Sequence, residues 1–327
     1  MPATPDMADA APARLGDPAL RAAVVAGLSQ RPRIIPARYF YDQRGSQLFE
    51  AITRLPEYYP TRTEIGILQE AAPAIARAVG PGRAVVEFGS GSSAKTPPLL
   101  RALESDLYIP VDISPAALAG AVAMLAEAAP GVAIHPVAAD FLGDWEVPEE
   151  SERHPLLGFF PGSTIGNMGP SAAVDLLRRF RARLGDDAMF LIGIDRRKDP
   201  AVLEAAYNDA AGVTAAFNLN LLARLAAEPG AEVEPDAFVH RAWWRDPPGR
   251  VEMHLEAVRP TVIALDGHRF ALNAGETIHT ENSHKYSAHE AEFLARASRW
   301  EPVAAWTDAR EWFGLHLWRA APDTLEP

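Results

Sequence analysis

The segment at residues 85–96 reads VVEFGSGSSAKT, an apolar run followed by a turn rich in glycine and serine and by a helix start. A strand, a glycine turn and a helix in this order bring backbone N–H groups close to a ligand. Gly89 and Gly91 permit the turn, and Glu87 and Lys95 flank it with opposite charges. The segment predicts a binding site for a nucleotide or a related nucleoside.

Three classes of ligand compete for this loop. A phosphate loop requires glycine directly before the lysine, and Ala94 stands there instead. A dinucleotide site tolerates alanine at the last position of its motif, and Asp112 lies at about the distance of a residue that holds a ribose. The motif therefore disfavours a phosphate loop. It is compatible with a dinucleotide and with the third class of ligand, S-adenosylmethionine.

Two further observations favour S-adenosylmethionine. An acid at Glu87 suits a cationic ligand better than a pyrophosphate, and after the third strand Asp140 can accept from an adenine amino group while Phe141 covers the base. Asp112 and Asp140 could each merely cap a turn, but acids that follow three successive parallel strands share one binding edge. The expected cofactor site comprises Glu87, Gly89, Gly91, Lys95, Asp112, Asp140 and Phe141.

The elements that position these residues alternate short β-rich runs with helical stretches between residues 83 and 196. This pattern is typical of a parallel sheet covered by helices. Ser114 followed by Pro115 marks the start of a helix at 116–129. Strands are expected at 84–88, 107–111, 132–137, 156–160 and 188–194.

After Asp195 the pattern changes to two helices and a set of alternating strands. Such a meander has no place in a doubly wound sheet, so it predicts an inserted lobe, after which the chain returns to the sheet with a helix and a final hairpin. The expected helices are 201–211, 214–227 and 287–297, and the expected strands are 237–244, 251–258, 261–265, 276–284, 302–307 and 314–319.

The fold class is therefore α/β, a Rossmann-like sheet with a second, inserted α+β domain that binds the substrate. A chain of 327 residues exceeds the size at which one core usually stops growing, which favours two lobes. The expected domains are an N-terminal segment at 1–60 that packs with the substrate domain, a cofactor domain at 61–195 and 287–327, and the substrate domain at 196–286.

Composition excludes several kinds of partner. The formal net charge of -12, without a basic stripe, argues against nucleic acid. The chain has no cysteine, which fits a reducing compartment, and no apolar run approaches the roughly 20 residues of a membrane span. The acidic start predicts a frayed arm and no secretory signal. We expect a cytoplasmic monomer that has no nucleic-acid or membrane partner.

The nine histidines do not form a metal-binding motif, because no H-E-x-x-H or comparable spacing occurs. His240, His254, His279 and His284 fall within the alternating strands and are expected to be surface or core residues. No metal site is predicted.

Aromatic, arginine and proline residues are dense before the sheet, as FYDQRGSQLF at 40–49 and LPEYYPTR at 55–62. With EFGSGSSAKT at 87–96, PGSTIGN at 161–167 and the pair Glu281 and Ser283, these segments closely resemble the histidine Nα-methyltransferases of ergothioneine biosynthesis. Five separated motifs fall in the order of the family, and the similarity runs from about residue 38 to the C-terminus. The resemblance implies a class I fold and S-adenosylmethionine as methyl donor.

The resemblance also implies which residues bind the amino acid. Asn167 and Tyr207 match the residues that hold its α-amino and carboxylate groups, and Tyr58, Glu281 and Ser283 match those that hold the imidazole. Glu281 and Ser283 are two apart on a predicted strand, so their side chains face the same way. A carboxylate and a hydroxyl together can bind an imidazole.

Two more residues follow from the resemblance. Met253 matches a residue that lines the side-chain pocket, and Tyr41 matches a tyrosine near the reacting nitrogen. Met253 shares its strand face with Val251 and Leu255 and could equally fill the core. Tyr207, among alanines on a helix, could be a packed tyrosine.

The expected chemistry needs neither a covalent nucleophile nor a metal. Alignment of the amine with an activated methyl group can be worth roughly 7 to 11 kcal/mol. The amine must first lose a proton, since its pKa near 8 in model peptides leaves it largely protonated at neutral pH. We expect Tyr41 to help accept that proton, directly or through water, while Asn167 orients the nitrogen.

The family resemblance implies three successive transfers that convert L-histidine into trimethylhistidine, called hercynine. A methyltransferase for another amino acid, such as tryptophan or a derivative, is the alternative within the class, and Glu281 with Ser283 favours imidazole over indole. A nicotinamide-dependent dehydrogenase or a binding module without activity is the alternative outside it.

Overall fold

The computed structural model describes residues 17–91, 93, 95–228 and 230–322, so most of the segment predicted to be a frayed arm lies outside the described residues. Contacts divide the chain into two compact units. The first comprises Met1–Ser46, Ala215–Arg241 and His254–Thr280, and the second comprises Gln47–Thr214, Ala242–Met253 and Glu281–Pro327. The domain limits predicted from the sequence differ from the limits of these two units, and the predicted domains stay a prediction.

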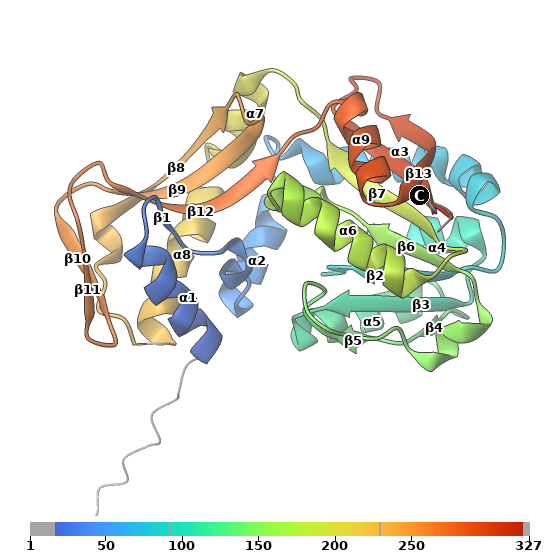
Figure 1. The fold of residues 1–327 in the computed structure, drawn as a ribbon, viewed down its shortest axis with the longest axis horizontal. Helices are drawn as coiled ribbons and strands as arrows, with labels where there is room; N and C mark the ends of the chain where they lie inside the picture. The colour runs from blue at the N-terminus through green and yellow to red at the C-terminus, as the bar shows by residue number, and fades with distance from the viewer. Residues whose placement is uncertain (1–16, 92, 94, 229, 323–327) are drawn as a thin grey trace, which may run out of the picture. The chain divides into compact units, whose positions relative to one another are not determined.

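The second unit contains an eight-stranded sheet in the order β13-β14-β7-β6-β2-β3-β4, with β5 also paired to β3 (Figure 1). Strands β2 to β7 pair in parallel, whereas β14 runs antiparallel to both β7 and β13. The Rossmann-like sheet and its final hairpin are therefore confirmed. Its strands are β2 (Ala84–Phe88), β3 (Leu107–Asp112), β4 (Ala133–Ile134), β5 (Val137–Ala138), β6 (Leu156–Phe160), β7 (Met189–Asp195), β13 (Trp300–Thr307) and β14 (Phe313–Ala320).

The predicted strand at 132–137 is wrong as a single element, because the structure has β4 and β5 there. The break includes Pro136, which has no N–H to donate to a sheet. The remaining predicted strands of this sheet agree with the observed ones within two residues at each end.

Helices cover both faces of this sheet. On one face α6 and α9 pack against alternate strand residues such as Val86 and Phe190, and on the other α3, α4 and α5 pack against Val85 and Leu191 (Figure 1). Burial on both faces explains why the central strands β2, β3, β6 and β7 are mostly apolar. The helices are α3 (Tyr59–Val79), α4 (Thr96–Leu103), α5 (Pro115–Ala128), α6 (Pro170–Leu184) and α9 (Ala288–Ala297).

The order of the parallel strands reverses between β2 and β6. From β2 the chain continues through α4 to its neighbour β3, whereas from β6 it continues through α6 to β7 on the other side. In open α/β sheets, ligands bind beyond the carboxyl ends of the strands at such a point. The loops at residues 89–95 and 161–167 both begin there.

The first unit contains a β10-β11 hairpin and several helices. Asp266 and Gly267 form its two-residue turn with positive φ values of 54° and 76°, which suits a tight hairpin. None of the helices among the described residues combines the length and apolarity needed to cross a bilayer. The elements are α1 (Pro18–Ser29), β1 (Arg33–Ile34), η1 (Ala37–Phe40), α8 (Val213–Ala227, of which the first two residues fall in the second unit), η4 (Pro235–Ala237), β10 (Thr261–Leu265) and β11 (His268–Leu272).

A four-stranded sheet has the order β1-β12-β9-β8, and the division between the units runs through three of its strands. These are β8 (Phe238–Arg245), β9 (Arg250–Ala257) and β12 (Thr277–His284), which match the predicted meander, and β1 and β11 were not predicted. The remaining elements are α2 (Gln43–Ile52), η2 (Glu149–Arg153), η3 (Thr164–Asn167) and α7 (Pro200–Tyr207).

Candidate active site

The glycine loop after β2 lies against two of the residues predicted to surround a cofactor. Gly89 and Gly91 have φ values of 69° and 50°, a conformation that disfavours other residues. The backbone N–H of Gly91 donates to Asp112 Oδ2 at 2.9 Å, and a Cβ on Gly89 would lie 3.4 Å from Phe141 Cε1. The structure thus brings Gly89, Gly91, Asp112 and Phe141 together at the carboxyl edge of the sheet.

Asp112 and Asp140 both cap turns. Asp112 Oδ1 accepts from the backbone N–H of Ser114 at 2.9 Å, and Asp140 Oδ1 accepts from that of Leu142 at 2.9 Å. An ionised carboxylate offers about four lone-pair sites, so these contacts leave capacity for ribose hydroxyls or an adenine amino group. The turn-capping and cofactor-binding interpretations are therefore compatible, and the loop fits the cofactor.

Glu87 is fully buried at the end of β2, and its Oε2 accepts from Thr96 Oγ1 at 2.5 Å and from the Tyr108 hydroxyl at 2.6 Å. Burial raises the pKa of this carboxyl to about 7, although the two hydrogen bonds oppose the shift. These contacts tie the start of α4 to β3. A contact between Glu87 and the cofactor stays a prediction.

Glu64 of α3 joins the two loops at the point where the strand order reverses. Its carboxylate accepts from Lys95 Nζ at 2.5 Å and from the backbone N–H of Gly162 at 2.9 Å. Glu64 is fully buried, and a Cβ on Gly193 would lie only 2.0 Å from its Oε1. Lys95, predicted to bind the cofactor, is thus held by an acid that the sequence did not identify.

The PGSTIGN turn connects the cofactor edge to strand β12. Ser163 Oγ accepts from the backbone N–H of Asp195 at 2.9 Å, which fixes the turn to the end of β7. A Cβ on Gly166 would lie 2.7 Å from the carbonyl oxygen of His284, so only glycine allows the turn to approach β12 this closely. Asn167 then lies where its side-chain amide hydrogen-bonds to the Glu281 carboxylate.

Glu281 has an unusual acidity for a glutamate. Burial raises its pKa to about 7, while the positive charge of Lys285 and the hydrogen bond from Asn167 act in the opposite direction. A carboxyl with a pKa near neutrality changes protonation readily, and such groups gather at functional sites. Glu281, with its hydrogen-bond partner Asn167, is therefore a candidate functional group.

Tyr58, Tyr207 and Ser283 form a second group next to this pair. The Tyr207 hydroxyl donates to Ser283 Oγ at 2.7 Å, and the ring of Tyr58 meets that of Tyr207 edge to face with centroids 6.2 Å apart. Burial raises the pKa of Tyr207, so its hydroxyl stays protonated. The Tyr207 hydroxyl is thus bonded to a second predicted site residue, and the role of Tyr207 in substrate binding stays a prediction.

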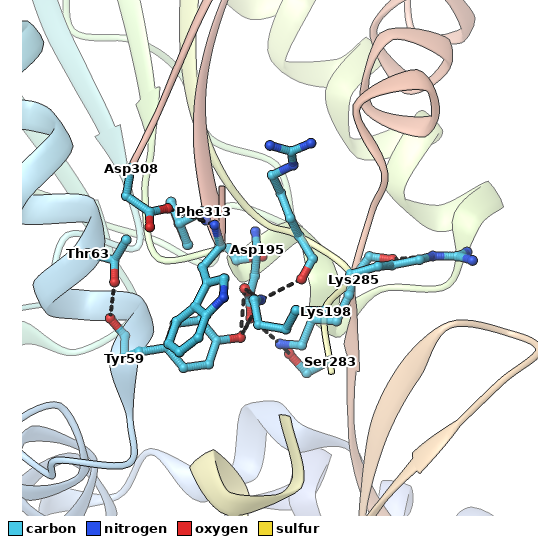
Figure 2. A network of polar contacts seen from close by, with 12 residues as sticks. Tyr59, Thr63, Asp195, Lys198, Ser283, Lys285, Asp308 and Phe313 are labelled. Atoms are coloured by element: carbon cyan, nitrogen blue, oxygen red, sulfur yellow. Dashed lines mark hydrogen bonds and ion pairs between the residues drawn. The ribbon is translucent and has the colours of Figure 1, made fainter. Parts of the chain in front are cut away.

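A buried polar network supports this group, and Figure 2 shows it around Asp195 at the end of β7. The Asp195 carboxylate accepts from the Tyr59 hydroxyl at 2.8 Å, from Lys198 Nζ at 2.6 Å and from Lys285 Nζ at 2.6 Å. The two ammonium groups hold the pKa of Asp195 below its usual value even though burial opposes them. Lys285 Nζ also donates to Ser283 Oγ at 2.8 Å and to the Tyr207 hydroxyl at 3.0 Å.

Met253 and Tyr41 complete the predicted set. Met253 is buried on β9, beside β12 in the four-stranded sheet, which agrees with either a pocket wall or a core position. Tyr41 belongs to the first unit, where its ring meets the edge of Phe217 with centroids 5.9 Å apart. The roles of both residues stay predictions.

The sequence did not point to Tyr59, Asp195, Lys198 and Lys285 of this network, or to Glu64 beside the glycine loop. The sequence could have identified Lys285, because it lies two residues after Ser283, as Ser283 lies two residues after Glu281, and such residues face the same way in an extended segment. The sequence could also have identified Asp195, because it ends a parallel strand at the same edge of the sheet as the predicted acids.

Comparisons with known proteins show the family of this chain. A sequence model of the family described as "Histidine-specific methyltransferase, SAM-dependent" matches residues 20–320. The chain is 41% identical to the histidine N-alpha-methyltransferase of Mycolicibacterium smegmatis, covering 91% of this chain and 94% of that protein. It is 34% identical to ergothioneine biosynthesis protein 1 of Neurospora crassa, covering 88% of this chain and 33% of that longer protein.

A solved structure supports the fold. The CcbJ methyltransferase of Streptomyces caelestis superposes with a TM-score of 0.50 at 18% identity, covering 86% of this chain and 100% of that one. At this identity the likeness concerns the fold alone. Because the family match spans nearly the whole described chain, the protein belongs to the histidine-specific, S-adenosylmethionine-dependent methyltransferases.

Proposed function

We propose that this enzyme methylates the α-amino nitrogen of L-histidine and repeats the transfer until trimethylhistidine, hercynine, is formed. The observation that carries the proposal is the contact between Asn167 and Glu281 beside the hydroxyls of Tyr207 and Ser283. This group offers an amide, a carboxylate and two hydroxyls, which match the polar groups of histidine. S-adenosylmethionine supplies an activated methyl group on its sulfonium.

The proposal assigns the imidazole to Glu281, Ser283 and Tyr58. A neutral imidazole carries one N–H donor and one acceptor nitrogen. The Glu281 carboxylate can accept from the first, the Ser283 hydroxyl can donate to the second, and the Tyr58 ring offers an apolar wall. The α-amino and carboxylate groups are assigned to Asn167 and Tyr207.

The α-amino group must be neutral to accept a methyl group, and we assign help with its deprotonation to Tyr41. A tyrosine hydroxyl can pass the proton directly or through a water molecule. Asn167 donates one amide hydrogen to the Glu281 carboxylate, which leaves its side-chain oxygen to orient the amine and its second hydrogen for the substrate's carboxylate. On this proposal Asn167 orients the amine and Tyr41 takes part in the proton transfer.

Tryptophan or a derivative is the weaker substrate class for this pocket. An indole offers only an N–H donor, so it leaves the Ser283 hydroxyl without an acceptor. Buried polar groups that lose their partners cost binding free energy, which disfavours indole. Glu281 together with Ser283 therefore supports an imidazole.

Mass spectrometry after incubation with S-adenosylmethionine and L-histidine tests the proposal directly. We expect products that carry one, two and three added methyl groups, with the trimethylated amine accumulating. L-tryptophan under the same conditions is the control substrate and should stay unmodified. Methylation of tryptophan in place of histidine, or of an imidazole nitrogen, would contradict the proposal.

The cytoplasmic location and the monomeric state expected from the sequence stay predictions. Sedimentation of the purified enzyme at several concentrations would measure the oligomeric state.

A further inference from the structure

Lys285 occupies a central position between two residues of the proposed histidine site. Its side chain is almost fully buried, and its ammonium group contacts three oxygens: Asp195 Oδ2 at 2.6 Å, Ser283 Oγ at 2.8 Å and the Tyr207 hydroxyl at 3.0 Å. An ammonium group has three hydrogens and no acceptor. All three hydrogens of Lys285 are thus committed to these contacts. Figure 2 shows Lys285 near Asp195 and Ser283.

These contacts determine what the Ser283 hydroxyl can offer a ligand. Ser283 Oγ accepts from Lys285 and also from the Tyr207 hydroxyl at 2.7 Å, so both of its lone pairs are used. Its own hydrogen finds no acceptor in the part of the chain that the structure describes. Toward a ligand, Ser283 can then act only as a hydrogen-bond donor.

Glu281 has the opposite polarity. It lies two residues before Ser283 on β12, so the two side chains face the same way. When ionised, the carboxylate of Glu281 only accepts hydrogen bonds. A donor and an acceptor side by side complement the two nitrogens of an uncharged imidazole, whereas an imidazolium, with two N–H groups, would meet the Ser283 hydrogen.

We propose that Lys285 is a positioning residue of the histidine site, which fixes Ser283 as a donor to the unprotonated imidazole nitrogen and aligns it with Tyr207. This inference rests on the proposed function, since it assumes that Ser283 binds the imidazole. Lys285 itself touches no reacting atom. It acts through the two hydroxyls that it holds.

Lys198 provides a matched control on the same carboxylate. Its ammonium group pairs with Asp195 at 2.6 Å, as that of Lys285 does, but it donates its other hydrogens to the Tyr59 hydroxyl and to the carbonyl oxygen of Arg196. Replacing either lysine removes one partner from Asp195 and leaves the other. Only the Lys285 replacement removes a hydrogen bond from Ser283 and from Tyr207.

The experiment is a double-mutant cycle read by calorimetric titration of L-histidine into enzyme saturated with S-adenosylhomocysteine. Lys285→Met and Ser283→Ala should each weaken histidine by about tenfold or more. The double variant should be little weaker than either single one, because both changes remove the same interaction. Lys198→Met should weaken histidine by less than about twofold and should add independently to Ser283→Ala.

S-adenosylhomocysteine affinity separates positioning from a general loss of structure. We expect Lys285→Met to leave it unchanged, and equal losses of both ligands would overturn the proposal. Effects of Lys285→Met and Ser283→Ala that multiply would overturn it as well. If Lys285→Met does not fold, Lys285→Gln, which keeps a donor and removes the charge, enters the same cycle.

Failure of this inference is distinguishable from failure of the proposed function. Wild-type enzyme that binds histidine together with a Lys285→Met variant of equal affinity contradicts the role of Lys285 alone. Wild-type enzyme that neither binds nor methylates histidine contradicts the proposed function and, with it, this inference.

Discussion

The side-chain amide of Asn167 hydrogen-bonds to the carboxylate of Glu281, although the two residues come from different parts of the fold. Asn167 ends the turn after β6, on the cofactor sheet, and Glu281 lies on β12. The family resemblance assigns one to the amino acid's α-amino and carboxylate groups and the other to its imidazole. On this assignment, a change at either residue should disturb the binding of both ends of the substrate.

Replacement of Asn167 by alanine should lower turnover by on the order of a hundredfold, because the amine loses its orientation toward the methyl donor. S-adenosylhomocysteine should still bind, since the contacts that hold Gly91 and Lys95 come from Asp112 and Glu64. Steady-state kinetics and calorimetry measure the two effects. Unchanged turnover would remove Asn167 from the site.

Replacement of Glu281 by alanine should raise the KM for histidine by about tenfold or more, as expected when a charged hydrogen-bond acceptor is lost. The affinity for S-adenosylhomocysteine should change little. Glu281→Gln, which keeps an acceptor oxygen in place, is the matched variant and should lose less. An equal loss of histidine and cofactor would instead indicate a structural role.

Glu64→Gln should weaken the cofactor, because it breaks the ion pair with Lys95 while leaving an acceptor for the Gly162 N–H. Removing one partner of a buried ion pair leaves the other charge poorly compensated. Glu70→Gln, an exposed position of the same helix, is the control and should bind normally. Thermal shift with S-adenosylhomocysteine compares the two. Equal shifts in both variants would show that Glu64 does not organise the loops.

Glu87→Gln should change how stability depends on pH. Burial raises the pKa of Glu87 from 4.5 to about 7, so the folded state binds this proton more tightly than the unfolded chain does. The contribution of Glu87 to stability is fully present below about pH 4.5 and is lost as the pH rises to about 7, which amounts to on the order of 3 kcal/mol.

Urea unfolding from about pH 5 to pH 8 measures this effect. The free energy of unfolding of the wild type, taken relative to that of Glu87→Gln, should fall as the pH rises. The difference is the informative quantity, because Glu281 acts in the same direction as Glu87, whereas His284 and His316, whose pKa burial lowers to about 4, act in the opposite one. Identical slopes in the two proteins would show that Glu87 is charged in the fold at neutral pH.

Much of the fold could be predicted from local patterns. β2 and β6 match their expected bounds because each is a short, mostly apolar run that ends in a turn signal. Of the β10-β11 hairpin, only strand β10 was predicted, although Asp266 and Gly267 are a typical hairpin turn. Strand β1 has only two residues and depends on its pairing with β12, which no local pattern reveals.

The site was predictable where a motif carries the chemistry and unpredictable where a partner comes from far along the chain. The sequence identified Asn167, Glu281 and Ser283 through their motifs, and the structure brings them into one group. Glu64 lies within a recognised segment, but its importance depends on Lys95 and Gly162, which only the folded sheet brings near. Distant electrostatic partners of this kind leave no local pattern.

The two lysines on Asp195 differ in how firmly they keep their protons. Burial lowers the pKa of Lys198 to about 8, whereas the negative charge of Asp195 and its hydrogen bond raise the pKa of Lys285 above its usual value despite burial. In mild alkali Lys198 becomes neutral first and leaves Asp195 to Lys285. The contacts of Lys285 with Ser283 and Tyr207 should therefore persist at a pH at which Lys198 has already lost its charge.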